Sequence, residues 1–223
     1  MLVDKMVLIA AAGVAVDAAY KMASAPEATP ESLHVLHQAF SPLTKGEITL
    51  GPALIGEYCG MADIVNAFPT NRDLFLTQET DNAVVRAVHR VTAPFVCNPQ
   101  ATIRGYLDVM GPVIVGASES PMRSVYDTVY DEPSQCVHIK NPLGHAMLSM
   151  CIPNCLEAKK KANMRKVQSD LLALQLSAKL GEPCGIKDWF TGRDYLHDRK
   201  TDLPFCAGPD GREGGGDDIF LNQ

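Results

Sequence analysis

Residues 154–181 read NCLEAKKKANMRKVQSDLLALQLSAKLG, and this stretch decides the fold of the C-terminal part of the chain. Apolar residues recur in it at intervals of three and four, which is typical of a helix with one apolar face. Gly181 follows the last apolar residue, and glycine commonly ends a helix in the left-handed conformation. One long helix is therefore expected over residues 154–180. Its apolar stripe comprises Met164, Val167, Leu171, Leu174 and Ala178.

Five basic residues gather early in this predicted helix: Lys159, Lys160, Lys161, Arg165 and Lys166. Positive charge near the start of a helix opposes the helix dipole, so the cluster is not placed for local stability. Two interpretations are open. The cluster is a solvated helix face, or it contacts an acidic partner or lipid head groups.

Shorter helices are expected upstream. Proline follows Thr29, Asn98 and Asn141, side chains that cap helices, and proline suits the first helical position. Ser41-Pro42 and Gly111-Pro112 predict two helix ends, and Pro153 can break the helical face before the long helix. The predicted helices cover residues 2–23, 30–40, 50–65, 81–92, 99–110 and 142–150.

The composition changes after Gly181. Residues 182–223 hold seven of the 17 glycines and the only tryptophan, Trp189. The runs at 194–197 and 219–221 predict short strands. The predicted fold class is therefore mainly α. An antiparallel helical array in residues 1–150 precedes a long helix and a small β-containing module in residues 151–223.

Composition restricts the class of protein. The chain has 223 residues, is 46% hydrophobic, and carries 26 acidic against 20 basic residues, a net charge of −6. This balance argues against a nucleic-acid partner, because such binding neutralises phosphates. The longest apolar run near the start, residues 6–16, is shorter than the about 20 residues of a membrane span. We expect a soluble chain whose membrane association requires a segment that this sequence does not contain.

The number of cysteines is odd, so at least one thiol is unpaired within the chain. Most of them are expected to be small buried hydrophobic residues, while a Cys184–Cys206 disulfide is the other interpretation. The seven cysteines are Cys59, Cys97, Cys136, Cys151, Cys155, Cys184 and Cys206.

Three segments of the C-terminal region share a resemblance. DWFTGRDY at 188–195 resembles the pattern D-P-F-T-G-K-P-Y, CAGPDG at 206–211 resembles the turn Y-S-x-G-P-D-G, and GGGDDI at 214–219 resembles G-G-x-D-D-I. Together they resemble the C-terminal segment of the major pseudopilins of type II secretion systems, over roughly residues 154–222. The methylated N-terminal F-T-L-I-E helix of that family has no counterpart in this sequence.

The resemblance implies a long helix packed on a small sheet and a terminal loop that binds calcium. Asp210, Asp217 and Asp218 match the acidic positions of that loop, and Cys206 stands where the family usually has a hydroxyl residue. Calcium prefers six to eight oxygen ligands, which carboxylates and carbonyls supply. An acidic surface turn without a metal is the alternative.

The whole chain also resembles a class of uncharacterised bacterial envelope proteins that join a helical array to a pseudopilin-like tail. Gly56-Glu57 and the segment NPLG at 141–144 match that class in type and order. The resemblance implies a location in the cell envelope, on the periplasmic side.

Histidines suggest two weaker sites. His34 and His37 lie three residues apart on a predicted helix, where they could share a metal with Glu31 or Cys59 or have a structural role. His138 and His145 could pair with a nearby cysteine as a nucleophile. No G-x-S-x-G, P-loop, H-E-x-x-H or dinucleotide-binding motif is present.

These patterns predict a non-enzymatic interaction or scaffold protein with protein partners and no catalytic residues. No small-molecule substrate is expected. The alternatives are a cysteine- and histidine-dependent hydrolase or redox enzyme, and a subunit of a larger complex.

Overall fold

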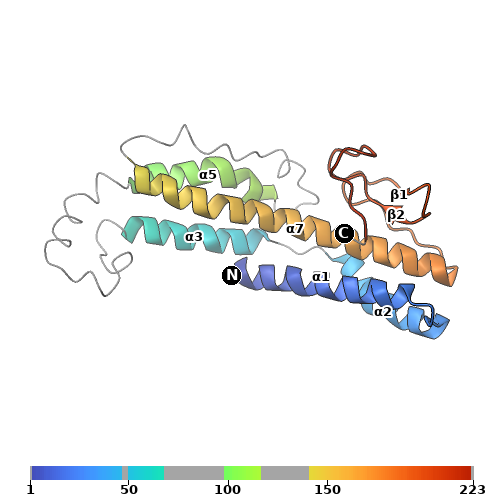
Figure 1. Cartoon of the computed structure of the whole chain (residues 1–223). Coiled ribbons are helices and arrows are strands. Elements are labelled where there is room, and N and C mark those ends of the chain that lie inside the picture. The colour runs from blue at the N-terminus through green and yellow to red at the C-terminus, as the bar shows by residue number, and fades with distance from the viewer. Residues whose placement is uncertain (1, 47–49, 68–97, 117–140, 222–223) are drawn as a thin grey trace. The chain divides into compact units, whose positions relative to one another are not determined.

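The computed structural model describes residues 2–46, 50–67, 98–116 and 141–221 of the chain. Over these residues the protein is mainly helical, with one small two-stranded sheet (Figure 1). The predicted mainly α fold class is confirmed at this level. The predicted helix at 81–92, Cys97, Cys136 and His138 lie outside the described residues, as does the side chain of His145.

Two helices open the chain: α1 spans Leu2–Ser24 and α2 spans Pro30–Lys45. Thr29 and Ser32 form a capping box before α2, because each backbone N–H donates to the other side chain (3.0 and 3.2 Å). The predicted end at Ser41-Pro42 is wrong, since α2 continues through the proline. The Thr44 hydroxyl donates to the Ser41 carbonyl (2.8 Å) and closes the last turn.

α3 (Gly51–Ala67) and α5 (Pro99–Gly116) pack against each other. The rings of Tyr58 and Tyr106 stack between them with centroids 5.8 Å apart. Tyr106 also contacts α7, through its hydroxyl at 3.9 Å from Cys155 Sγ. This ring therefore joins three helices.

The predicted start of α5 is confirmed, but its predicted end is not. Asn98 caps its start as predicted, since Oδ1 accepts a hydrogen bond from Ala101 N (3.0 Å). The predicted end at Gly111-Pro112 is wrong. Proline removes one helical hydrogen bond, but Val113 is buried on the same face as Met110 and keeps the next turn helical.

α7 spans Pro142–Leu180 as one helix of 39 residues. The break expected near Pro153 is wrong. Ile152 and Cys155 are buried on either side of it, so packing holds this segment in helical conformation despite the proline. Within the described residues, no helix has both the length and the apolar character that a membrane span requires.

The predicted end of α7 at Gly181 is confirmed. Gly181 has φ 70°, and its N–H donates to the Ala178 carbonyl (3.2 Å). The next N–H, of Glu182, donates to the Ser177 carbonyl (2.9 Å). These two bonds are the Schellman motif, which satisfies carbonyl groups at the helix end.

The chain forms two compact units, and α7 contributes to both. Described residues of one unit are residue 2 and those within 50–67, 98–116 and 141–157, and those of the other lie within 3–46 and 158–221. α1 and α2 thus share a unit with the C-terminal residues. The predicted domain boundary after residue 150 stays a prediction.

The unit that contains the C-terminal residues is built around α7. Leu171 and Leu172 project about 100° apart on a helix, yet both are 0% exposed. More than one side of α7 is therefore covered, and Figure 1 shows α1 and α2 on one side and the strands on the other. The core cluster comprises Val16, Ala19, Ala23, Leu33, Val167, Leu171, Leu172, Leu176, Phe190, Tyr195, Cys206, Ile219 and Leu221.

The sheet is small and antiparallel. β1 (Leu196–His197) pairs with β2 (Pro204–Phe205), and a single bridge joins Cys206 to Ile219. The strand predicted at 194–197 is confirmed over its second half. The strand predicted at 219–221 is reduced to that bridge.

Candidate functional site

An ionic cluster of Lys166, Asp170 and Tyr195 joins the C-terminal residues to α7. Asp170 is 0% exposed and accepts hydrogen bonds from Lys166 Nζ (2.6 Å to each oxygen) and from the Tyr195 hydroxyl (3.0 Å). Burial raises the pKa of Asp170, and this effect outweighs the lowering by Lys166 and Tyr195. Desolvation thus exceeds the attraction within the pair, as buried ion pairs often show.

We expect Asp170→Asn to remove a pH dependence from stability. Since the pKa is raised, the folded protein holds this proton more tightly than the unfolded chain, where aspartates titrate near 3.8. This contribution to stability is fully present below that value and is lost as the pH rises through the raised pKa. Urea unfolding from about pH 3 to about pH 8 should show the wild type losing free energy of unfolding relative to Asp170→Asn. A pH-independent difference would contradict the raised pKa.

Two of the basic residues predicted on a helix surface are buried. Lys159 is 0% exposed, and the Lys166 side chain is 8% exposed. Lys166 Nζ also lies 5.0 Å from the ring centroid of Trp189, a cation–π contact. The solvated-face interpretation is wrong for these two residues, because C-terminal residues that sequence periodicity does not reveal cover Lys166.

Asp188 organises the turn that carries Tyr195. Its Oδ1 accepts hydrogen bonds from the backbone N–H groups of Phe190 (2.9 Å) and Thr191 (2.8 Å). The Tyr195 hydroxyl accepts one from Trp189 N (3.3 Å). The segment with the pseudopilin-like pattern thus has a structural role: it presents a tyrosine to the ionic cluster.

Cys206 is a buried free thiol beside this turn. It is 0% exposed, and burial raises the pKa of the thiol, with a further raising effect from Asp188. Cys59, Cys155 and Cys184 are also free, so the Cys184–Cys206 disulfide interpretation is wrong. A buried thiol with a raised pKa is a poor nucleophile.

The three aspartates singled out in the sequence shape the C-terminal loop. Asp217 Oδ2 accepts a hydrogen bond from Asp210 N (3.2 Å), and Asp218 Oδ2 accepts one from Gly214 N (2.9 Å). Asp210 Oδ1 accepts one from Arg212 N (2.7 Å). One oxygen of each carboxylate therefore holds the loop, which leaves the other oxygen for a ligand.

Two of these remaining oxygens converge. A Cβ at Gly215 would lie 2.5 Å from Asp210 Oδ2 and 2.8 Å from Asp217 Oδ1. A side chain at position 215 would clash with both oxygens, so glycine permits their approach, and carboxylate oxygens are ligands that calcium prefers. Asp217 Oδ1 and Asp218 Oδ1 are buried without a hydrogen-bond partner in the described structure.

Asp210 and Asp217 are therefore the two aspartates whose remaining oxygens approach each other beside Gly215. Among residues 2–46, 50–67, 98–116 and 141–221, no three His, Cys, Asp or Glu side chains share one metal-binding position. Backbone carbonyls and water would have to complete a calcium shell.

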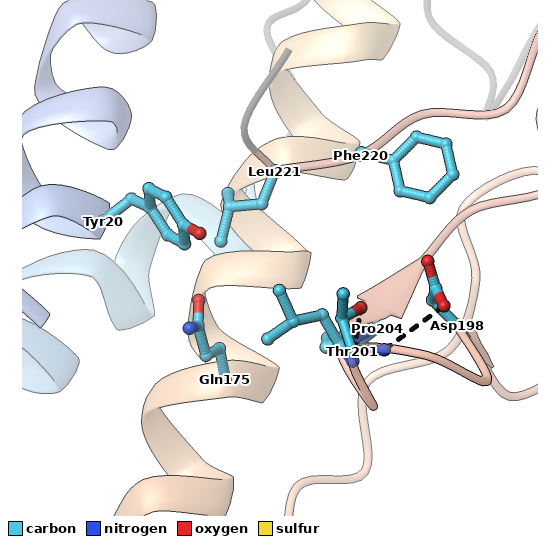
Figure 2. A pocket seen from close by; sticks show the side chains of 8 residues that line it. Tyr20, Gln175, Asp198, Thr201, Pro204, Phe220 and Leu221 are labelled. Atoms are coloured by element: carbon cyan, nitrogen blue, oxygen red, sulfur yellow. Dashed lines mark hydrogen bonds between the residues drawn. The ribbon is translucent and has the colours of Figure 1, made fainter. Parts of the chain in front are cut away.

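A cavity of about 90 Å³ lies between α1, α7 and the C-terminal residues (Figure 2). Tyr20 and Gln175 line it from the helices, and Leu203 and Leu221 line it from the C-terminal side. Gln175 Oε1 is buried without a hydrogen-bond partner among the described residues. A partly polar cavity of this size can hold ordered water.

A wider hollow of about 460 Å³ opens beside the end of α7. Cys184 and His197 both line it, and His197 Nδ1 lies 3.2 Å from the Asp202 carbonyl oxygen. Asp202 has φ 55°, the left-handed region that few residues other than glycine adopt. In the described part of the chain, no hydrogen bond joins Cys184 to His197.

Comparison with protein-family models, with curated proteins and with solved structures finds no match for this chain. The fold and the site define a mainly helical protein whose C-terminal residues pack on a long helix through an ionic cluster. The pseudopilin resemblance of residues 188–219 stays a hypothesis.

Proposed function

We propose that the protein is a non-enzymatic interaction or scaffold protein of the bacterial cell envelope, and that it works as a subunit of a larger assembly. The observation that carries this proposal is the apolar outer face of α1. Protein partners contact this face, while the C-terminal residues stabilise the scaffold.

α1 carries two apolar stripes. One is buried in its own unit and includes Val16, which is 0% exposed. The other, here called the outer stripe, is exposed: Val3, Val7, Val14 and Met22 are 62%, 63%, 71% and 58% exposed. Its members recur at helical spacing along the whole helix, and large exposed apolar patches mark interaction surfaces. The outer stripe comprises Val3, Val7, Ala11, Val14, Ala18 and Met22.

Site-specific photo-crosslinking in the native cells tests the proposal. A photo-activatable residue at position 7 or 14 should give crosslinked protein products, because these side chains lie in the outer stripe. Val35, which is 62% exposed on α2 outside the stripe, is the matched control position and should give none. Equal yields at all three positions, or no product at 7 and 14, would contradict the proposal.

The pseudopilin-like part of the proposal concerns the C-terminal residues. The order of a long helix, a small antiparallel sheet and a glycine-rich acidic loop supports it, because the resemblance implies the same order. In this proposal the module stabilises the envelope scaffold through the apolar core that it shares with α7, α1 and α2.

Calcium at the C-terminal loop is the metal part of the proposal, supported by the convergence of Asp210 and Asp217. Calcium at ten times its dissociation constant should raise the melting temperature by about 3–6 °C. Asp217→Ala should abolish this rise, since it removes an oxygen beside Gly215. Asp194→Ala, at a side chain that is 84% exposed, should retain it. A wild type without any calcium response would refute the site.

A cysteine- and histidine-dependent hydrolase or redox enzyme is the second candidate, which the shared hollow of Cys184 and His197 favours. A catalytic thiolate would react with iodoacetamide at neutral pH faster than an unactivated thiol. We expect Cys184 to react no faster in the folded protein than in urea. A rate about tenfold higher in the folded protein would favour the enzyme over the scaffold.

A further inference from the structure

We infer that His34, His37 and Glu182 bind a divalent transition-metal ion, and that Zn²⁺ suits them best. His34 and His37 lie three residues apart on α2, so they occupy neighbouring positions on one helix face. The sequence suggests Glu31 or Cys59 as the further ligand, whereas in the structure the Glu182 carboxylate lies near both rings. Imidazole nitrogens and a carboxylate are common zinc ligands.

The two imidazoles lie on the two oxygens of one carboxylate, beyond hydrogen-bond distance. His34 Nδ1 lies 3.6 Å from Glu182 Oε1, and His37 Nδ1 lies 3.6 Å from Glu182 Oε2. Both separations exceed those of a hydrogen bond. Two ligands of a tetrahedral zinc ion, each bound at about 2.1 Å, stand roughly 3.4 Å apart. Each gap is thus within about 0.2 Å of the spacing of two ligands on one ion.

The end of α7 positions Glu182. The Schellman motif at Gly181 ties the Glu182 N–H to the Ser177 carbonyl (2.9 Å), which fixes the backbone of this ligand. The C-terminal end of a helix carries partial negative charge, which favours a bound cation.

A second contact orients one imidazole. Ser177 Oγ lies 3.2 Å from His37 Nε2, the ring nitrogen that is not directed at Glu182. Hydrogen bonds of this kind fix the tautomer and the orientation of metal-binding histidines. Ser177 therefore acts as a positioning residue.

The ligands have the freedom to close around an ion. No three such side chains in the described part of the chain meet at one coordination point. The side chains of His34, His37 and Glu182 are 52%, 27% and 41% exposed, so their torsions can adjust. Their exposed side leaves the fourth zinc position to water.

Calorimetric titration of the full chain with Zn²⁺, in a reductant without thiols, tests this site. His34→Ala and Glu182→Gln should each weaken binding at least about tenfold, and Ser177→Ala should weaken it about tenfold. The matched control is His197→Ala, which removes another exposed imidazole of the same unit (59% exposed) and should bind like the wild type.

Co²⁺ as a spectroscopic probe separates this site from adventitious binding by cysteines. Thiolate ligands produce an intense near-ultraviolet charge-transfer band, which a site of two imidazoles and a carboxylate lacks. Circular dichroism of each variant checks that the helices persist. The inference is overturned if the wild type does not bind Zn²⁺, or if His34→Ala and Glu182→Gln bind it with unchanged affinity.

Discussion

Replacing Asp170 by alanine is expected to lower the free energy of unfolding by about 3–5 kcal/mol. The substitution leaves the Lys166 ammonium, on a side chain that is 8% exposed, without its carboxylate. It also removes the acceptor of the Tyr195 hydroxyl. An uncompensated buried charge costs more than the loss of the pair itself. Urea unfolding followed by the fluorescence of Trp189, the only tryptophan, reports on the unit that contains this cluster.

The exposed ion pair of Lys187 and Asp194 is the matched control. Its nitrogen–oxygen distance is 2.5 Å, but its side chains are 56% and 84% exposed. Asp194→Ala should therefore cost only about 0–1 kcal/mol. If Asp170→Ala and Asp194→Ala lower the free energy of unfolding by similar amounts, burial does not determine how strongly the loss of a carboxylate destabilises the protein.

Removing both charges separates the destabilisation caused by an unpaired buried ion from the net contribution of the intact ion pair to stability. The double variant Lys166→Met with Asp170→Leu leaves no unpaired ion, and the raised pKa of Asp170 indicates that desolvation exceeds the attraction. Most of the stability lost in Asp170→Ala should return. A double variant as unstable as Asp170→Ala would show that the cluster itself supplies that stability.

Helix starts and one helix end were predictable because their signals are local. Thr29 and Asn98 cap α2 and α5 through residues three positions away, and Gly181 ends α7 through bonds within its last turn. The helix ends predicted at prolines were wrong. Proline costs one hydrogen bond locally, whereas burial of Val113 or Ile152 depends on other helices that no local pattern reveals.

The acidic loop was recognisable for the same reason, since Asp210 and Asp217 are joined by a hydrogen bond seven residues apart. Asp170 was not recognised. In sequence it has the pattern of a surface aspartate four residues after a lysine, and no local pattern reveals its hydrogen bond with Tyr195, 25 residues away. The pairing of His37 with Glu182 likewise depends on tertiary structure, which brings α2 to the end of α7.

Leu172→Ala tests whether α7 is covered on more than one side. Leu172 is 0% exposed but lies outside the stripe that the sequence predicts. If only that stripe were covered, alanine here would cost little. Because α1, α2 and the C-terminal residues all contribute to the core around α7, we expect a loss of about 2–5 kcal/mol from the lost apolar contacts and the cavity.

Trp189 fluorescence in urea again reports on the affected unit, because Trp189 packs against the same core cluster. Leu196→Ala is the matched control, since it deletes the same atoms from a side chain that is 40% exposed, and it should cost less than about 1 kcal/mol. If Leu172→Ala costs no more than Leu196→Ala, α7 is covered along one stripe only. The C-terminal residues and the α1–α2 pair could then not both pack on this helix.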